Sequence, residues 1–218
     1  MAIEIQLGLK PLSEDTCKSL LYTAGEVFAE YGFRAATVRE ICRRANVNVA
    51  SINYHFGGKE ELYAQVLEHA FRTAAEKYPF DTAGIGPPEK RLEEFITNFM
   101  RGCLGCGQAA WHGKLMAREM IDPTGVLTRI VERAIRPRKK ILTGIVTEIL
   151  GEGFSDEEIE RCVFSIIGQC VFYSHAKPVI IVINPSIKYD DSWITRTAGH
   201  ITDFSLAAIR LMARRKRR

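Results

Sequence analysis

Apolar residues recur at intervals of three and four positions along most of the chain. The first such stretch lies between Ser13 and Gly32, and its apolar positions are Cys17, Leu20, Leu21, Ala24, Phe28 and Tyr31. Later stretches with the same spacing begin at Lys59, Glu89, Ser155 and Asp190. These intervals place the side chains on one face of an α-helix. The pattern therefore predicts an all-α fold in which each helix buries one face.

Segment 37–59 is different, because it predicts two short helices joined by a tight turn. Thr37 is suited to cap the first helix, since its hydroxyl can accept a backbone N–H that the first turn leaves unpaired. Asn46 tolerates the left-handed conformation of a turn, and Asn48 is a second N-cap residue. The glycine pair 57–58 ends the second helix. This arrangement is typical of a helix-turn-helix, whose second helix enters the DNA major groove.

The two faces of that second helix differ in chemistry. Ile52 and Phe56 share its only strongly apolar face and are predicted to pack inward, and His55 lies nearer to this face. The opposite face is expected to approach DNA and carries Ala50, Ser51, Asn53 and Tyr54. Asparagine can bond adenine through two hydrogen bonds, serine can bond several base edges, and an alanine methyl can contact a thymine methyl.

Charge supports DNA binding locally rather than across the whole chain. The formal net charge is +4 for 218 residues, and the last five residues, 214–218, are all basic. The body of the chain is therefore not generally basic, and the tail is expected to be solvated. Within residues 34–59 only Glu40 opposes a set of basic residues, Arg34, Arg39, Arg43, Arg44 and Lys59. That local excess provides the attraction to phosphates on which DNA affinity depends.

The same region resembles the N-terminal DNA-binding domain of the TetR family of transcription regulators. The matching positions are Gly32, Phe33, Thr37, Val38, Ile41, Ala45, Val47, Tyr54, His55, Phe56, Lys59 and Leu62. Two positions depart from the family pattern: Ala50 stands where glycine is frequent, and Asn53 where a tyrosine usually contacts a phosphate. The stretches INYHFGGKEELY and AGHITDFSLAAIRLM are similar to a narrower group, the CecR-like regulators.

The resemblance implies a homodimeric regulator in two parts. A three-helix DNA-binding domain would occupy residues 13–58, a helical ligand-binding and dimerisation domain residues 59–213, and a basic tail residues 214–218. The last two long helices would form a four-helix bundle with those of a second copy. Such regulators are usually repressors that bind a palindromic operator in double-stranded DNA and are released by a small-molecule effector. The expected DNA-binding residues are Thr37, Arg39, Arg44, Asn48, Ala50, Ser51, Asn53, Tyr54, His55 and Lys59.

The effector is expected to bind in the larger domain. Ligand cavities combine apolar bulk with a few polar groups, and the residues of that kind are Phe99, Cys103, Trp111, His112 and Met116. A helix from Lys59 to Tyr78 would connect such a cavity with the DNA-binding domain. Three alternatives stay open: a regulator gated by thiol oxidation or a metal through Cys103 and Cys106, a helical enzyme that uses Cys103 and His112, and a DNA-binding protein without sequence preference.

Three further expectations concern the layout of the larger domain. Residues 122–123, Asp-Pro, are predicted to start a helix, because proline is favoured in the first turn, and Pro137 is predicted to kink or split it. Ser155 and Glu158 form a capping box at the start of another helix. Residues 177–189 are predicted to be a non-helical connection whose aliphatic part has strand propensity.

The rest of the chain predicts no further chemistry. Neither a metal nor a cofactor is expected, and the absence of a catalytic triad, a phosphate-binding loop and a dinucleotide fingerprint argues against an enzyme. The N-terminal residues lack the pattern of a signal peptide. The longest aliphatic run, Val179–Ile183, is too short to span a bilayer. We therefore expect a cytoplasmic protein, away from membranes, with its cysteines as reduced thiols.

Overall fold

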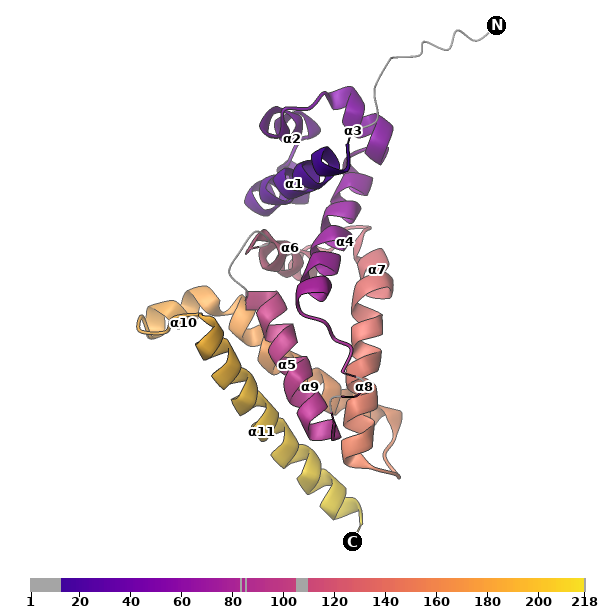
Figure 1. The fold of residues 1–218 in the computed structure, drawn as a ribbon, viewed down its shortest axis with the longest axis vertical. Coiled ribbons are helices and arrows are strands. Elements are labelled where there is room, and N and C mark those ends of the chain that lie inside the picture. The colour runs from indigo at the N-terminus through magenta and orange to yellow at the C-terminus, as the bar shows by residue number, and fades with distance from the viewer. Residues whose placement is uncertain (1–12, 83, 85, 105–109, 218) are drawn as a thin grey trace, which may run out of the picture.

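The computed structural model describes residues 13–82, 84, 86–104 and 110–217, which form an all-helical molecule in two parts (Figure 1). A small N-terminal part lies at one end of the molecule, and α4 extends from it toward the longer helices of the second part. The helices are α1 Glu14–Ala35, α2 Val38–Ala45, α3 Val49–Phe56, α4 Lys59–Lys77, α5 Pro88–Leu104, α6 Ala110–Ile121, α7 Leu127–Ile130, a π-helical turn Val131–Ile135, α8 Arg136–Leu150, α9 Asp156–His175, α10 Lys177–Ile183 and α11 Asp191–Lys216.

The first helix begins and bends where the sequence predicts. The Ser13 hydroxyl accepts the backbone N–H of Thr16 at 3.2 Å, which caps α1. Gly32 has φ 79°, a left-handed conformation that glycine adopts without strain. One further turn, ending at Ala35, follows this kink. The predicted stop at Gly32 is therefore a sharp bend that redirects the chain into α2.

Two separate apolar clusters support the two parts of the molecule. The first lies between α1, α2, α3 and α4, with Phe28 and Tyr63 among its fully buried side chains, and it also includes Trp111 and Leu115 of α6. The second lies between α5, α8, α9 and α11, around Phe95. Full burial of a large apolar side chain contributes about 1.5–3 kcal/mol. Helix α6, although distant in sequence, therefore packs against the N-terminal part and completes its core.

The chain between α6 and α8 differs from its prediction. Residues 122–126 form a turn, and α7 begins only at Leu127, so the predicted helix start at residues 122–123 is wrong. The cause is a local side-chain bond: Glu119, five residues earlier in α6, accepts the Thr124 N–H and so favours a turn over a first helical turn. Pro137 stands in the first turn of α8, directly after the π-helical turn. A π-helical turn thus precedes Pro137, and the helix continues through this residue without the predicted split.

The prediction for residues 177–189 also requires correction. Residues Lys177–Ile183 form helix α10, so the prediction of a non-helical connection is wrong for this part. Pro178 occupies the first turn, where its missing N–H costs nothing. Local helical bonding satisfies the backbone of the run, because the described residues offer it no partner strand. In the part of the chain that the structure describes, no single helix is long and apolar enough to cross a membrane. Only α9 and α10 together reach that length and apolarity, and they are bent by 67°.

Candidate nucleic-acid interface

The geometry of a helix-turn-helix is present between Thr37 and Gly57. The Thr37 hydroxyl accepts the N–H of Glu40 at 3.2 Å and caps α2. Asn46, with φ 52°, makes the left-handed turn after α2. The side chain of Asn48 then accepts the Ala50 N–H at 2.9 Å and caps α3. All these predicted cap and turn positions are confirmed, which fixes the direction in which α3 leaves the turn.

The inward face of α3 is the predicted one, with one addition. Ile52 is fully buried and Phe56 is 5% exposed, both within the first cluster. Ser51 is only 7% exposed, so the prediction that it lies on the outward face is wrong. Ser51 is one residue from Ile52, and the apolar face of an eight-residue helix is wide enough to cover such a neighbour.

The outward face of α3 carries three well-exposed side chains. Tyr54 is 68% exposed, and Asn53 is exposed beside it. Val49 is 40% exposed, although the sequence interpretation overlooked it. Its position four residues before Asn53 is the signal that placed it on this face. Ala50 and His55 are half-buried, and the His55 ring stands edge-on to Tyr54 with 4.9 Å between centroids. The surface thus combines an amide, a phenol and a methyl-bearing side chain.

The two arginines in the last turn of α2 are held by acidic partners. Arg44 donates to Glu40 and to Glu30 at 2.7 Å, and its side chain is only 27% exposed. Arg43 makes a two-bond pair with the same Glu40. These bonds from Arg43 and Arg44 lower the pKa of Glu40 to about 2. Arg44 therefore fastens α2 to the end of α1, a role that the sequence interpretation did not foresee because Glu30 belongs to another helix.

Lys59 and Arg39, the other basic residues predicted to bind DNA, differ in their burial and in their contacts within the chain. The Lys59 ammonium donates to the carbonyl oxygen of Arg34 at 3.0 Å and lies 4.8 Å from the centroid of the Phe33 ring. Partial burial lowers the pKa of Lys59. Arg39 is exposed and forms no ion pair with any residue that the structure describes. Arg39 is thus an exposed positive charge beside the turn, whereas Lys59 joins the start of α4 to the end of α1.

A buried polar contact connects this interface with the second part of the molecule. Glu119 of α6 is 1% exposed and accepts the Tyr63 hydroxyl of α4 at 2.8 Å. It also accepts the N–H and the hydroxyl of Thr124, at 3.1 and 3.2 Å. Burial and the bond to Glu119 raise the pKa of Tyr63. Both oxygens of this carboxylate are therefore bonded, and any movement of α4 along α6 would break the bond from Tyr63.

The five residues predicted to bind the effector fall into two groups. Trp111 and Met116 belong to the first cluster, where the Trp111 ring fills the space beside Gly25 of α1. Phe99 and Cys103 pack against the second cluster. His112 stands edge-on to Phe71 of α4, with 4.6 Å between ring centroids. These residues thus divide between the two clusters, and their role in effector binding stays a prediction.

The chemistry of Cys103 and His112 differs from that of a catalytic pair. Burial raises the pKa of the Cys103 thiol to about 12 and lowers the pKa of His112 to about 4. Both groups are therefore neutral near pH 7, whereas a cysteine nucleophile acts as a thiolate. Cys106 lies outside the described residues, and among those residues no three side chains of the types that bind metals come together.

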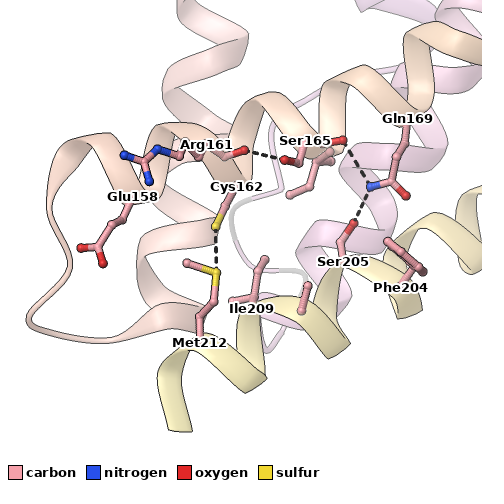
Figure 2. Close-up of a pocket in the computed structure, with 11 residues that line it drawn as sticks. Glu158, Arg161, Cys162, Ser165, Gln169, Phe204, Ser205, Ile209 and Met212 are labelled. Carbon is pink, nitrogen blue, oxygen red and sulfur yellow. Dashed lines mark hydrogen bonds between the residues drawn. The ribbon is translucent and has the colours of Figure 1, made fainter. Parts of the chain in front are cut away.

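The second part of the molecule exposes an apolar groove between α9 and α11 (Figure 2). The groove has a volume of about 380 Å³, and its apolar lining includes Phe204, Ile209 and Met212. Figure 2 shows Cys162 of α9 pointing at Met212 of α11, with 3.7 Å between the two sulfur atoms. Large side chains on the same two helices are more than half exposed: Phe164 at 56%, Phe172 at 59% and Phe204 at 63%.

A capped helix-turn-helix above a larger helical domain defines a transcription regulator of the TetR type, and residues 20–66 match the bacterial regulatory proteins of the tetR family. Residues 88–209 match the C-terminal domain of the HTH-type transcriptional dual regulator CecR, so the chain belongs to the CecR-like regulators of the TetR family. CecR of Shigella flexneri is 27% identical over 188 residues, which are 82% of this chain and 84% of CecR. The predicted resemblance is confirmed.

Solved structures support the same fold. A variant of HlyIIR, a hemolysin II transcriptional regulator, is 26% identical, with a TM-score of 0.62 over 87% of this chain and 98% of that chain. The regulator FadR from Bacillus subtilis, in complex with stearoyl-CoA, has a TM-score of 0.64 at 17% identity, over 87% of this chain and 97% of FadR. At that identity FadR shows the fold alone. The predicted all-α architecture is confirmed.

Proposed function

We propose that this regulator is a repressor that binds a palindromic operator as a homodimer and leaves it when a small organic molecule binds the larger domain. The observation that carries the proposal is the outward face of α3, held opposite the buried Ile52 and Phe56. That face is short and polar, and it carries side chains that suit base edges in the major groove. Residues 13–58 are the proposed DNA-binding domain, and residues 59–213 the proposed effector and dimerisation domain.

Base recognition is assigned to the exposed side chains of α3. Asn53 suits an adenine edge, and Val49 and Ala50 suit thymine methyl groups. Tyr54, together with the exposed Arg39 and the capping residues Thr37 and Asn48, is assigned to phosphates. Phosphate contacts position the protein without reading sequence. Ser51, Arg44 and Lys59 are assigned to the support of the helices, because of their burial or their bonds within the chain.

A second copy of the chain is the proposed occupant of the α9–α11 surface. One α3 helix covers only a few base pairs, so useful specificity needs two half-sites presented by symmetry. The exposed aromatic side chains Phe164, Phe172 and Phe204 are the kind of residues that become buried in homodimer interfaces. The groove of Figure 2, with apolar walls and a polar rim formed by Glu158 and Arg161, has the anatomy of such an interface.

Release by an organic molecule is supported by the position of α4. This helix carries Lys59 at the DNA-binding end and Phe71 at the junction of the two clusters. A ligand that favours one position of α4 must bind that state more tightly, and a tenfold loss of operator affinity needs about 1.4 kcal/mol of difference. FadR, a regulator of the same fold, was solved with stearoyl-CoA, which supports an effector that is an organic molecule.

The test is selection of DNA fragments from a random pool by the purified protein. A palindromic site is expected. The Asn53→Ala variant should recover a different half-site, because a base contact is removed. Arg39→Ala should recover the same site, with a salt dependence lower by about 1, because only a phosphate contact is removed. Ser51→Ala, also on α3, is the control that should change neither property.

Two outcomes would contradict the proposal. Fragments without any enriched sequence would favour the alternative of a DNA-binding protein without sequence preference. An unchanged half-site for Asn53→Ala, with a changed one for Ser51→Ala, would show that α3 is oriented differently on DNA.

A further inference from the structure

Arg138 of α8 is a partly buried cation that lacks an acidic partner. Arg44, Arg101 and Arg129 have side chains that are 26–29% exposed, and each of them binds a carboxylate at 2.6–2.7 Å. Arg138 has no such carboxylate among the residues that the structure describes, although burial is strong enough to lower the pKa of its guanidinium. An arginine side chain stays protonated even when it is partly buried. This site therefore holds a positive charge that the described chain does not neutralise.

Aromatic rings and one carbonyl oxygen hold the guanidinium in place. Its central carbon lies 4.7 Å from the centroid of the Phe71 ring and 4.9 Å from that of Phe80. One Nη2–H donates to the backbone carbonyl oxygen of Phe71 at 2.8 Å. The remaining N–H groups have no acceptor among the described residues, and guanidinium carries five donors. Arg138 is thus fixed in orientation, with hydrogen-bond donors still available.

A second unpaired polar group lies at the same junction. His112 of α6 is 8% exposed, and its Nε2 atom is buried without a hydrogen-bond partner in the described chain. Its ring contacts Phe71, the ring that also contacts Arg138. Burial, followed by the charge of Arg138, lowers the pKa of His112 to about 4, so the imidazole is neutral near pH 7. A buried polar atom without a partner costs roughly 1–3 kcal/mol, and a ligand that bonds it recovers that cost.

We propose that Arg138 and His112 form a receptor site for a carboxylate group on an effector with an apolar body. A guanidinium matches a carboxylate through two parallel bonds, and a neutral imidazole can add one more through Nε2–H. The single positive charge of Arg138 balances a monoanion, whereas a phosphate dianion would leave one negative charge in a largely apolar site. Phe71 and Phe80, which contact the guanidinium, and Phe99, which contacts Phe80, suit an aliphatic or aromatic body.

This inference rests on the proposed function, because it names the chemistry of the effector. It also supplies a route to the DNA-binding domain. Arg138 is bonded to the backbone of α4 at Phe71, and Lys59 stands at the other end of the same helix. A carboxylate that draws the guanidinium toward α6 acts directly on this bond. The expected result is a different preferred position of α4.

The experiment uses two matched pairs of probes, octanoate with octanamide and phenylacetate with phenylacetamide. Each is titrated calorimetrically into the full chain without DNA at pH 7.5. At least one carboxylate should bind at one site per chain, tenfold or more tightly than its amide. Arg138→Gln should lose at least tenfold in this affinity. Arg136→Gln, two residues earlier on α8 and paired with Glu132 at an exposed position, should bind as the wild type does.

A conservative variant and a local spectroscopic measurement serve as controls for misfolding of Arg138→Gln. Arg138→Lys keeps the charge but loses the planar pair of donors, so its affinity should lie between wild type and Arg138→Gln. In ¹⁵N spectra of the imidazole groups, the Nε2 signal of His112 should shift when the carboxylate binds. Absence of saturable binding of both carboxylates, equal affinity of Arg138→Gln, or an unmoved His112 signal would each overturn the carboxylate site.

The failure of this site can be distinguished from failure of the proposed function. If neither carboxylate binds, but a neutral compound releases operator DNA equally well from wild type and Arg138→Gln, the carboxylate site is refuted and regulation by a ligand stands. If the carboxylate binds as expected but leaves operator binding unchanged, the site stands and release by this ligand class is refuted.

Discussion

The two parts of the molecule expose different kinds of large side chain. In the N-terminal part the exposed ones are Tyr31, Val49 and Tyr54, and two of these three carry a hydroxyl group. On α9 and α11 they are Phe164, Phe172, Phe204 and Leu211, which carry no polar atom beyond the backbone. Hydroxyl and amide groups suit the edges of bases and phosphates, whereas bare aromatic rings suit a protein partner. The difference supports the proposal that one surface recognises DNA and the other binds a second copy of the chain.

The largest effect is expected from a substitution that disrupts the α9–α11 surface. Phe204→Glu places a charge in the α9–α11 groove, so we expect sedimentation to show a monomer at micromolar concentration. Operator affinity should fall at least a hundredfold, or about 2.7 kcal/mol, because each half-site is then bound alone. Val182→Glu on α10, which is 79% exposed and outside the groove, should leave the dimer intact. A dimeric Phe204→Glu would refute the assignment of this surface.

The next effect concerns the junction of the two parts. A Cβ atom at Gly25 would lie 2.5 Å from carbon atoms of the Trp111 ring. Gly25→Ala must therefore displace the ring or α1, which costs about 2 kcal/mol. Gly144→Ala on α8, where a Cβ atom meets nothing within 4 Å, should be neutral or stabilising by about 0.5–1 kcal/mol. Urea unfolding of both variants checks this, and equal stabilities would show that α1 and α6 are not in close contact.

The smallest effect concerns the polar contact across the same junction. Tyr63→Phe removes the hydroxyl that donates to the buried Glu119 and leaves the ring in place. A hydrogen bond to a buried charged group is worth about 1.5 kcal/mol, so stability should fall by that amount. Tyr22→Phe on α1, where the ring also packs against the first cluster, is the matched control and should change little. A Tyr63→Phe variant as stable as the wild type would mean that water replaces the hydroxyl.

Local signals in the sequence were sufficient for most helix boundaries. Ser13, Thr37, Asn48 and Ser155 cap the predicted helices, because a cap depends on atoms within three residues. The predictions that failed depended on contacts that capping rules and intrinsic propensity do not describe. The turn at residues 122–126 is set by Glu119. Strand propensity in the run that forms α10 has no effect, because the residues that the structure describes contain no strand to pair with it.

The candidate site follows the same rule. The inward packing of Ile52 and Phe56 was predictable from helical spacing, whereas the burial of Ser51 required the width of the surrounding packing. Arg44 has the composition of a phosphate contact, but Glu30 on α1 binds it, and no spacing rule connects residues 14 positions apart on two helices. The domain boundary at residues 58–59 remains a prediction.

The contact between Gly25 and Trp111 has a consequence for protein engineering. Regulators of modular build invite exchange of the DNA-binding domain, so that one sensor controls another promoter. In this chain the space beside α1 is filled by Trp111 of α6, which belongs to the domain that such an exchange would retain. A donor domain with a larger residue at the position of Gly25 will collide with that ring. Chimaeras built on this scaffold should therefore treat the two positions as one unit and replace them together.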